Sequence, residues 1–212
     1  MENFQTEEQQ VEAIKGFWKE YGNLVIGGLI LGFSGFIGFN YYQDSKLASE
    51  VEVTESFIQL QENAQKAPAS FAQESEKFIQ ANSDSAYASL AGFALAKTAI
   101  GNKDWAAAEQ HLTTAIEQSA DKGIKAVGSL RLARVQIQAD KVDEALVTLG
   151  KEYPVSFLAS VESLKGDAYL QQGKNELARA AYQTAIDNNG LQADPNLQMK
   201  LDDLAQVTTL AK

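Results

Sequence analysis

The sequence contains no cysteine, and this absence excludes several kinds of chemistry. Its 212 residues include no cysteine, one histidine and three prolines. Without a thiol the chain has no disulfide, no thiolate nucleophile and no cysteine metal ligand. The single histidine, His111, has no companion histidines for a metal site or a catalytic triad. We therefore expect no enzymatic activity, no catalytic residue, no metal and no cofactor.

Positive charge is also scarce. Lysine and arginine together number 18, aspartate and glutamate number 28, and the formal net charge is -10. Nucleic-acid binding requires a surface of lysine and arginine that neutralises phosphates, so this balance argues against a nucleic-acid partner. The excess of carboxylates mainly predicts a soluble, self-repelling surface.

One long hydrophobic run lies near the N-terminus. Residues 24–42 read LVIGGLILGFSGFIGFNYY and carry no charged side chain. These 19 residues would extend about 28 Å at a rise of about 1.5 Å each, close to the hydrocarbon thickness of a bilayer. Aromatic residues stand on both sides of the run, as membrane interfaces favour. We predict a cytoplasmic amphipathic head at 1–22 and a transmembrane helix at 23–42, in contact with the lipid bilayer.

A cleaved signal peptide is the alternative to an uncleaved anchor. The apolar run is long for a signal peptide, an acidic head precedes it, and no small-residue cleavage site follows promptly. We therefore favour the anchor. Lys15 and Lys19 precede the span and Lys46 follows it. Because cytoplasmic flanks are enriched in positive charge, this difference of one lysine predicts a cytoplasmic N-terminus.

Several glycines in the span share one helical spacing. Gly28 and Gly32 form a GxxxG step, and Gly35 continues the stripe of small residues. Such a stripe allows another helix to approach closely in lipid, so we predict a helix-packing surface there. It would suit a homodimer or a heteromeric contact equally well. The alternative is that membrane helices are simply rich in glycine.

The remainder of the chain predicts an all-α repeat domain at 43–212. Three segments, 93–116, 130–149 and 165–186, each read as a helix, a short polar turn and a second helix. Small residues in the second helices, Ala108, Ala145 and Ala178, are 37 and 33 residues apart. This is close to the 34-residue period of tetratricopeptide repeats. We expect a tetratricopeptide-like α-solenoid of helical hairpins, with an entry pair of helices at 45–63 and 71–81 and a closing helix at 196–207.

A solenoid of this kind presents a concave surface that binds peptides or partner helices. By repeat position, five side chains are predicted to line a partner groove: Phe93, Lys97, Leu130, Arg134 and Asp167. The alternative is that the charged members are ordinary solvated residues and that the two apolar ones pack internally.

Three stretches together resemble one known family: VEAIKGFWKEYGNLVIGGLILGFSGFIGFNYY, LRLARVQIQ and QMKLDDL. Their order and spacing are similar to those of the YfgM family of bacterial inner-membrane proteins, over about residues 10–204. The resemblance implies a single-pass protein of the Gram-negative inner membrane, with a cytoplasmic N-terminus and a periplasmic repeat domain. It also implies an ancillary subunit of the SecYEG translocon that works with the periplasmic chaperone PpiD to assist newly translocated proteins. The family supplies no catalytic residue.

The sequence is also compatible with other functions. The repeat domain would also suit a free-standing, membrane-anchored periplasmic holdase that binds emerging client polypeptides in its own groove. A scaffold for envelope assembly is a further possibility, and an enzyme is a remote one. Suppression of aggregation by the repeat domain alone would favour the holdase, whereas septal localisation would favour the scaffold.

Overall fold

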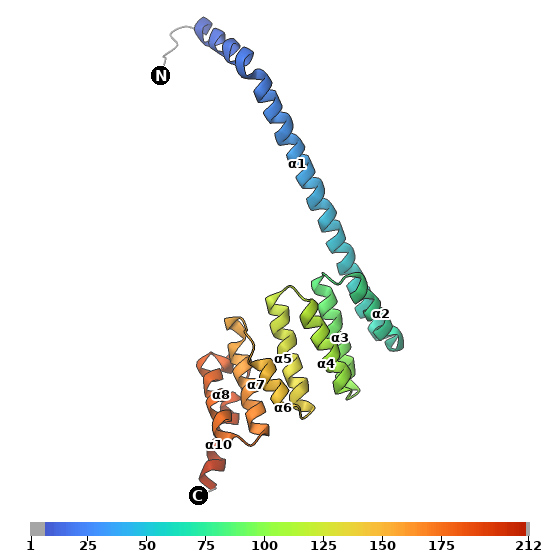
Figure 1. The fold of residues 1–212 in the computed structure, drawn as a ribbon, viewed down its shortest axis with the longest axis vertical. Coiled ribbons are helices and arrows are strands. Elements are labelled where there is room, and N and C mark those ends of the chain that lie inside the picture. The colour runs from blue at the N-terminus through green and yellow to red at the C-terminus, as the bar shows by residue number, and fades with distance from the viewer. Residues whose placement is uncertain (1–6, 211–212) are drawn as a thin grey trace. The chain divides into compact units, whose positions relative to one another are not determined.

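A computed structural model describes residues 7–210 of the protein, and these fold into helices with no strand among them (Figure 1). In chain order the elements are α1 (Glu7–Lys66), α2 (Pro68–Ala81), α3 (Ala86–Gly101), α4 (Trp105–Gln118), α5 (Lys122–Gln138), α6 (Val142–Leu149), the 3-10 helix η1 (Val155–Phe157), α7 (Leu158–Gln171), α8 (Asn175–Asp187), α9 (Gly190–Ala193) and α10 (Leu197–Leu210). The predicted all-α class is confirmed. Residues 1–6 of the predicted head lie outside the described residues.

Helix α1 runs unbroken for 60 residues. It contains the described part of the predicted head, the predicted span and the first helix of the predicted entry pair. The helix expected at 45–63 is therefore the C-terminal part of α1 and not a separate element, because no proline separates it from the span. Pro68 begins α2, at a helix position where its missing N–H costs no hydrogen bond. Within the described part of the chain, α1 is the one helix long and apolar enough to cross a membrane.

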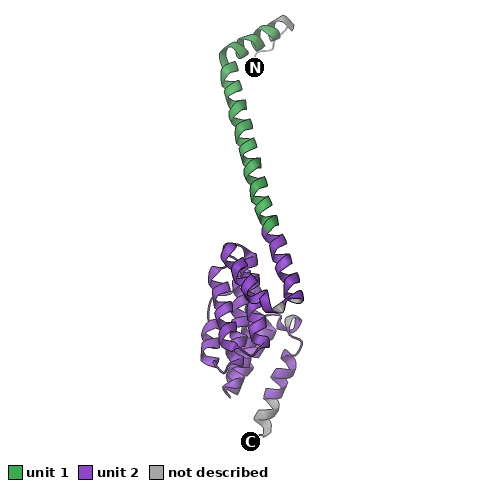
Figure 2. Cartoon of the chain, turned by 90° about the vertical axis from the view of Figure 1, so that its right-hand side faces the viewer, with its two compact units in different colours: residues 1–52 green, residues 53–212 purple. Residues whose placement is uncertain are grey.

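The chain divides into two compact units, residues 1–52 and residues 53–212 (Figure 2). In the first unit, the described side chains of the span are almost all exposed. The second unit contains the C-terminal end of α1 and every later helix, and its core consists of four clusters of buried apolar side chains. Among the described residues, the buried hydrophobic core therefore lies in the second unit.

The repeat unit consists of successive helical hairpins, α3 with α4, α5 with α6, and α7 with α8, stacked side by side (Figure 1). Ala108, Ala145 and Ala178, which the repeat spacing aligned, are each 0 % exposed. Their methyl groups let the paired helices approach closely, as the sequence predicted.

The turn inside each hairpin has one conformation in all three repeats. Lys103, Asp140 and Gly173 occupy the left-handed region, with φ of 58°, 62° and 70°. After each of them, the next backbone N–H donates back to a carbonyl in the preceding helix, from Asp104 to Ala99, from Lys141 to Gln136 and from Lys174 to Tyr169. This is the hydrogen bond of a Schellman helix end. The left-handed residues are 37 and 33 residues apart, like the alanines, so two independent features give the same repeat register.

Helix α10 closes the C-terminal end of the repeat unit, close to the predicted range of 196–207. Leu197 and Leu204 are 1 % and 3 % exposed and pack in a cluster with Tyr182 of α8. The preceding turn is fixed by Asp194, whose Oδ1 accepts a hydrogen bond from the Asn196 N–H at 3.0 Å. The final helix therefore covers the last hairpin, which would otherwise expose its apolar face.

Candidate protein-binding groove

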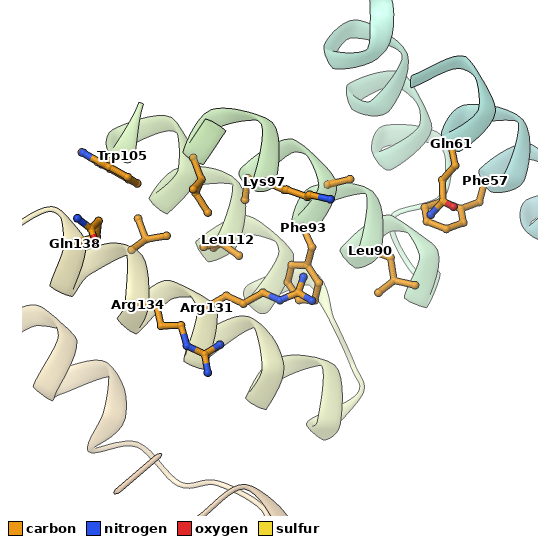
Figure 3. Close-up of a pocket in the computed structure, with 14 residues that line it drawn as sticks. Phe57, Gln61, Leu90, Phe93, Lys97, Trp105, Leu112, Arg131, Arg134 and Gln138 are labelled. Carbon is orange, nitrogen blue, oxygen red and sulfur yellow. The ribbon is translucent and has the colours of Figure 1, made fainter. Parts of the chain in front are cut away.

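The repeat unit carries a groove of about 640 Å³ at its N-terminal end. Its walls come from the C-terminal part of α1 and from α3, α4 and α5 (Figure 3). All of these segments belong to the compact unit 53–212. The volume lies within the range of roughly 300–1,000 Å³ that is common for binding clefts.

Helical spacing explains why side chains far apart in sequence face this groove. On α3, Leu90, Phe93 and Lys97 lie three and four positions apart, so they share one face. On α5, Arg131 and Arg134 repeat the same three-residue step. The two faces meet because α3 and α5 flank α4 within the stack.

The floor of the groove is apolar and fixed. Phe93, Leu112 and Val135 are 5 %, 1 % and 4 % exposed, and they belong to one core cluster. Leu90 and Ile100 line the same groove but are each 37 % exposed. The groove therefore has a buried apolar base and an accessible apolar wall, which is the usual composition of a binding site.

The charged residues of the groove are all cations. Lys97, Arg131 and Arg134 line it, and no aspartate or glutamate does. The Arg131 guanidinium lies over the Phe93 ring, with Cζ 4.8 Å from the ring centroid, a cation–π contact that holds this side chain against the groove wall. None of the three cations takes part in a salt bridge within the described chain. Their charge is therefore free to meet a partner.

The structure brings together three of the five side chains that the sequence assigned to a partner groove. Phe93, Lys97 and Arg134 all line this groove (Figure 3). Arg134 also lines a smaller cavity of about 170 Å³ beside α7 and the segment before α10. Leu130 and Asp167 lie elsewhere.

Leu130 is 6 % exposed and packs in the core cluster between α5, α6 and α7. Asp167 lies on α7, where its Oδ1 accepts a hydrogen bond from the Tyr182 hydroxyl at 2.7 Å. The same oxygen forms an ion pair with Lys200 Nζ, also at 2.7 Å. Burial and the neighbouring Asp167 raise the pKa of Tyr182 well above its usual range. In this structure Asp167 therefore joins α7, α8 and α10 rather than facing the groove.

Several groove residues were not predicted from the sequence. Arg131 and Gln138 were findable, because they share the α5 face of Arg134 at spacings of three and four residues. Phe57 and Gln61 were not findable, because they lie on α1, more than thirty residues before Phe93. Phe57 is held in place by the Tyr87 ring, with centroids 5.0 Å apart.

The glycines of the span present a second candidate contact surface. A Cβ atom added at Gly28, Gly32 or Gly35 meets no other atom within 4 Å. Their spacing of four and three residues places them on one face of α1. The stripe is therefore open to a neighbouring helix, and the helix-packing role remains a prediction.

The fold and the groove define the class of the protein: a tetratricopeptide-like repeat protein that carries one candidate membrane-spanning helix. A family model described as tetratricopeptide repeat-like domain matches residues 15–206. No solved structure matches the chain.

Several bacterial proteins, each named as an ancillary SecYEG translocon subunit, are similar along nearly the whole chain. The protein from Aggregatibacter actinomycetemcomitans is 34% identical over 198 residues, covering 93% of this chain and 97% of the relative. Those from Haemophilus influenzae and Escherichia coli K12 are 33% and 30% identical, over 93% and 97% of this chain and 97% and 100% of the relatives. This chain belongs to the family of ancillary SecYEG translocon subunits, which confirms the resemblance drawn from the sequence.

Proposed function

We propose that this protein is a non-catalytic ancillary subunit of the SecYEG translocon whose repeat domain lies in the periplasm of a Gram-negative bacterium. There it works with the chaperone PpiD to assist newly translocated proteins. The single observation that carries the proposal is the full-length relationship, which includes both the span and the repeats. Relatives named for this role align over 97% to 100% of their own length.

The orientation follows from the flanks of the span. Lys15 and Lys19 precede it and Lys46 follows it, so the positive-inside tendency favours a cytoplasmic head. The repeat unit follows the span and would then lie in the periplasm, where emerging chains are found.

The two candidate surfaces suit two different contacts. The open stripe of Gly28, Gly32 and Gly35 suits a helix of the channel within the membrane. The groove of the repeat unit suits a soluble partner or an emerging chain, because it combines accessible apolar walls with free cations. The protein would then connect the channel to a periplasmic protein.

Affinity purification of the full-length protein in mild detergent tests the proposal. It is compared with a variant whose span is replaced by a polyleucine helix, and bound proteins are identified by mass spectrometry. We expect channel subunits and PpiD to accompany the native protein, and the channel alone to be lost with the replaced span. Absence of both partners from both samples would refute the translocon assignment.

A membrane-anchored holdase is the second candidate function, favoured by the exposed apolar wall at Leu90 and Ile100. It is tested with the full-length protein in nanodiscs and a chemically denatured client. Strong suppression of aggregation without PpiD would favour the holdase, whereas suppression only with PpiD present supports the ancillary role.

A further inference from the structure

The charge of the groove is opposite to the charge of the chain. Carboxylates outnumber cationic side chains by 28 to 18 in the sequence, yet the groove is lined by three cations and no carboxylate. Some other cations of the repeat unit form ion pairs: Lys141 with Glu109, Lys165 with Glu162, and Lys200 with Asp167. The three groove cations form no salt bridge among the described residues, so a partner in the groove would meet them unpaired.

We propose that the groove binds a polypeptide segment that presents acidic side chains beside apolar ones. The inference rests on the proposed function of the groove as a protein-binding surface and specifies the chemistry of the bound segment. Carboxylates of the segment would pair with Lys97, Arg131 and Arg134, and its apolar side chains would pack against the wall formed by Leu90 and Ile100. Complementary charge of this kind selects partners and speeds their association.

The three cations can contact a bound segment from two sides of the groove. Lys97 projects from α3, whereas Arg131 and Arg134 project from α5 on the other wall. Arg131 is already held over the Phe93 ring at 4.8 Å, so little side-chain freedom is lost when it binds a carboxylate. A guanidinium also meets a carboxylate with two parallel hydrogen bonds.

The ends of the groove favour a peptide over a lipid. Gln138 lies with Trp105 at one end in the view of Figure 3, and Gln61 lies with Phe57 at the other. A side-chain amide donates and accepts hydrogen bonds, so these two amides match the N–H and C=O groups of a peptide backbone. A hydrocarbon tail would form no hydrogen bond with either amide.

The test uses the full-length protein in nanodiscs of neutral phosphatidylcholine, so that the membrane adds no competing anionic charge. The probe is a short fluorescein-labelled peptide of leucine and glutamate, and its matched counterpart carries lysine in place of each glutamate. Fluorescence anisotropy reports binding. We expect the glutamate peptide to bind, the lysine peptide not to bind, and the affinity to fall as salt screens the charges.

Two pairs of variants separate charge from apolar contact. The double change Arg131→Glu and Arg134→Glu should weaken binding of the glutamate peptide by roughly tenfold or more and allow the lysine peptide to bind. The control for charge is Lys77→Glu, an exposed lysine on α2 outside the groove. The double change Leu90→Ser and Ile100→Ser should also weaken binding, and its control is Leu177→Ser on α8, where the leucine is 49 % exposed. Both controls should bind like the native protein.

Three outcomes would overturn the proposal. They are equal binding of the two peptides, native affinity in the Arg131 and Arg134 double variant, and failure of the glutamate peptide to bind while fluorescently labelled oleate binds in its place. The last outcome would instead assign the groove to an anionic lipid. Co-purification of the channel with the same double variant distinguishes this failure from failure of the proposed function. If the channel is retained while the peptide fails, only the chemistry assigned to the groove is wrong.

Discussion

Glycine is used differently in the two units of this protein. In the span, a Cβ atom at Gly28, Gly32 or Gly35 would meet nothing within 4 Å. In the repeats, a Cβ atom at Gly128 would lie 2.7 Å from Cγ1 of Ile116, and one at Gly166 would overlap the Tyr182 ring. Gly128 and Gly166 are therefore required by neighbours in the same chain.

This difference indicates that any helix packed against the span glycines belongs to another protein chain. A glycine in a helix interior costs about 1 kcal/mol relative to alanine, and in the repeats close packing offsets this cost. No contact within α1 offsets it for the span glycines. If these glycines serve packing, their partner is another helix in the membrane. Substitutions at closely packed positions of the repeat unit should then lower the free energy of unfolding, whereas substitutions of the span glycines should weaken binding of a partner.

The largest effect is expected for Tyr182→Ala. Tyr182 is 0 % exposed, fills the space beside Gly166 and donates to Asp167. Loss of a buried aromatic side chain costs about 3–5 kcal/mol through lost burial and the cavity left behind. Urea unfolding of the full-length protein in detergent micelles measures the change, and a loss below about 1 kcal/mol would show that α8 repacks around the gap.

A smaller loss is expected for Gly166→Ala, because the new methyl group must displace the Tyr182 ring. Overpacking of this kind costs about 1–3 kcal/mol. The matched control is Gly101→Ala, at the end of α3, where an added Cβ meets nothing within 4 Å. In a Tyr182→Ala background the change at Gly166 should cost little or become stabilising, because the ring that clashes with the new methyl group has been removed. Equal costs in both backgrounds would contradict the assigned contact.

Tyr182→Phe keeps the ring beside Gly166 but removes its hydroxyl, so it separates volume from hydrogen bonding. Loss of the bond to Asp167 should cost about 1 kcal/mol near neutral pH. Folding raises the pKa of Tyr182, mainly by burial and to a smaller extent through Asp167. The neutral phenol therefore contributes stability that is complete below the ordinary tyrosine pKa of about 10 and declines as pH rises above it. The free energy of unfolding should fall more steeply above pH 10 in the native protein than in Tyr182→Phe, and parallel curves would contradict this.

The helical repeat was predictable because its signals are local. Ala108, Ala145 and Ala178 marked the close contacts, and all three are fully buried. The continuity of α1 was missed because a sequence that lacks a stop signal does not show whether two predicted helices join. Only Pro68 marks a break there, and it is used to begin α2.

The groove was only partly predictable because α5 is packed on more than one side. Leu130 and Ala133 are buried toward α6 and α7, whereas Leu132 and Val135 are buried toward α3 and α4. With apolar residues on opposite sides, the helix has no single polar face to mark the groove. Repeat position alone therefore grouped Leu130 with Arg134, although only Arg134 lines the groove. The contribution of Phe57 depends on a contact distant in sequence.

A modest gain is expected for Lys103→Gly. Lys103 has φ of 58° in the turn between α3 and α4, the place that Gly173 holds in the third repeat. Glycine adopts this conformation without steric cost, so the change should stabilise the repeats by about 0.5–1 kcal/mol. The converse change Gly173→Ala should destabilise them by a similar amount. Urea unfolding checks both, and a loss of stability in Lys103→Gly would mean that the flexibility of the unfolded chain outweighs relief of the turn.

The smallest effect on unfolding is expected for the double change Gly28→Leu and Gly32→Leu. A Cβ atom added at either glycine has nothing within 4 Å outside the backbone of its own helix, so the free energy of unfolding of the repeat unit should stay within about 0.5 kcal/mol of the native value. Co-purification of the channel should nevertheless be lost, because the bulky side chains prevent close approach of another helix. The control is Ile30→Leu and Leu31→Ile, which leaves the stripe intact, and full co-purification with the glycine variant would assign those glycines to membrane composition alone. A variant that loses its partner while keeping its fold would show that the reason for these glycines lies outside the chain.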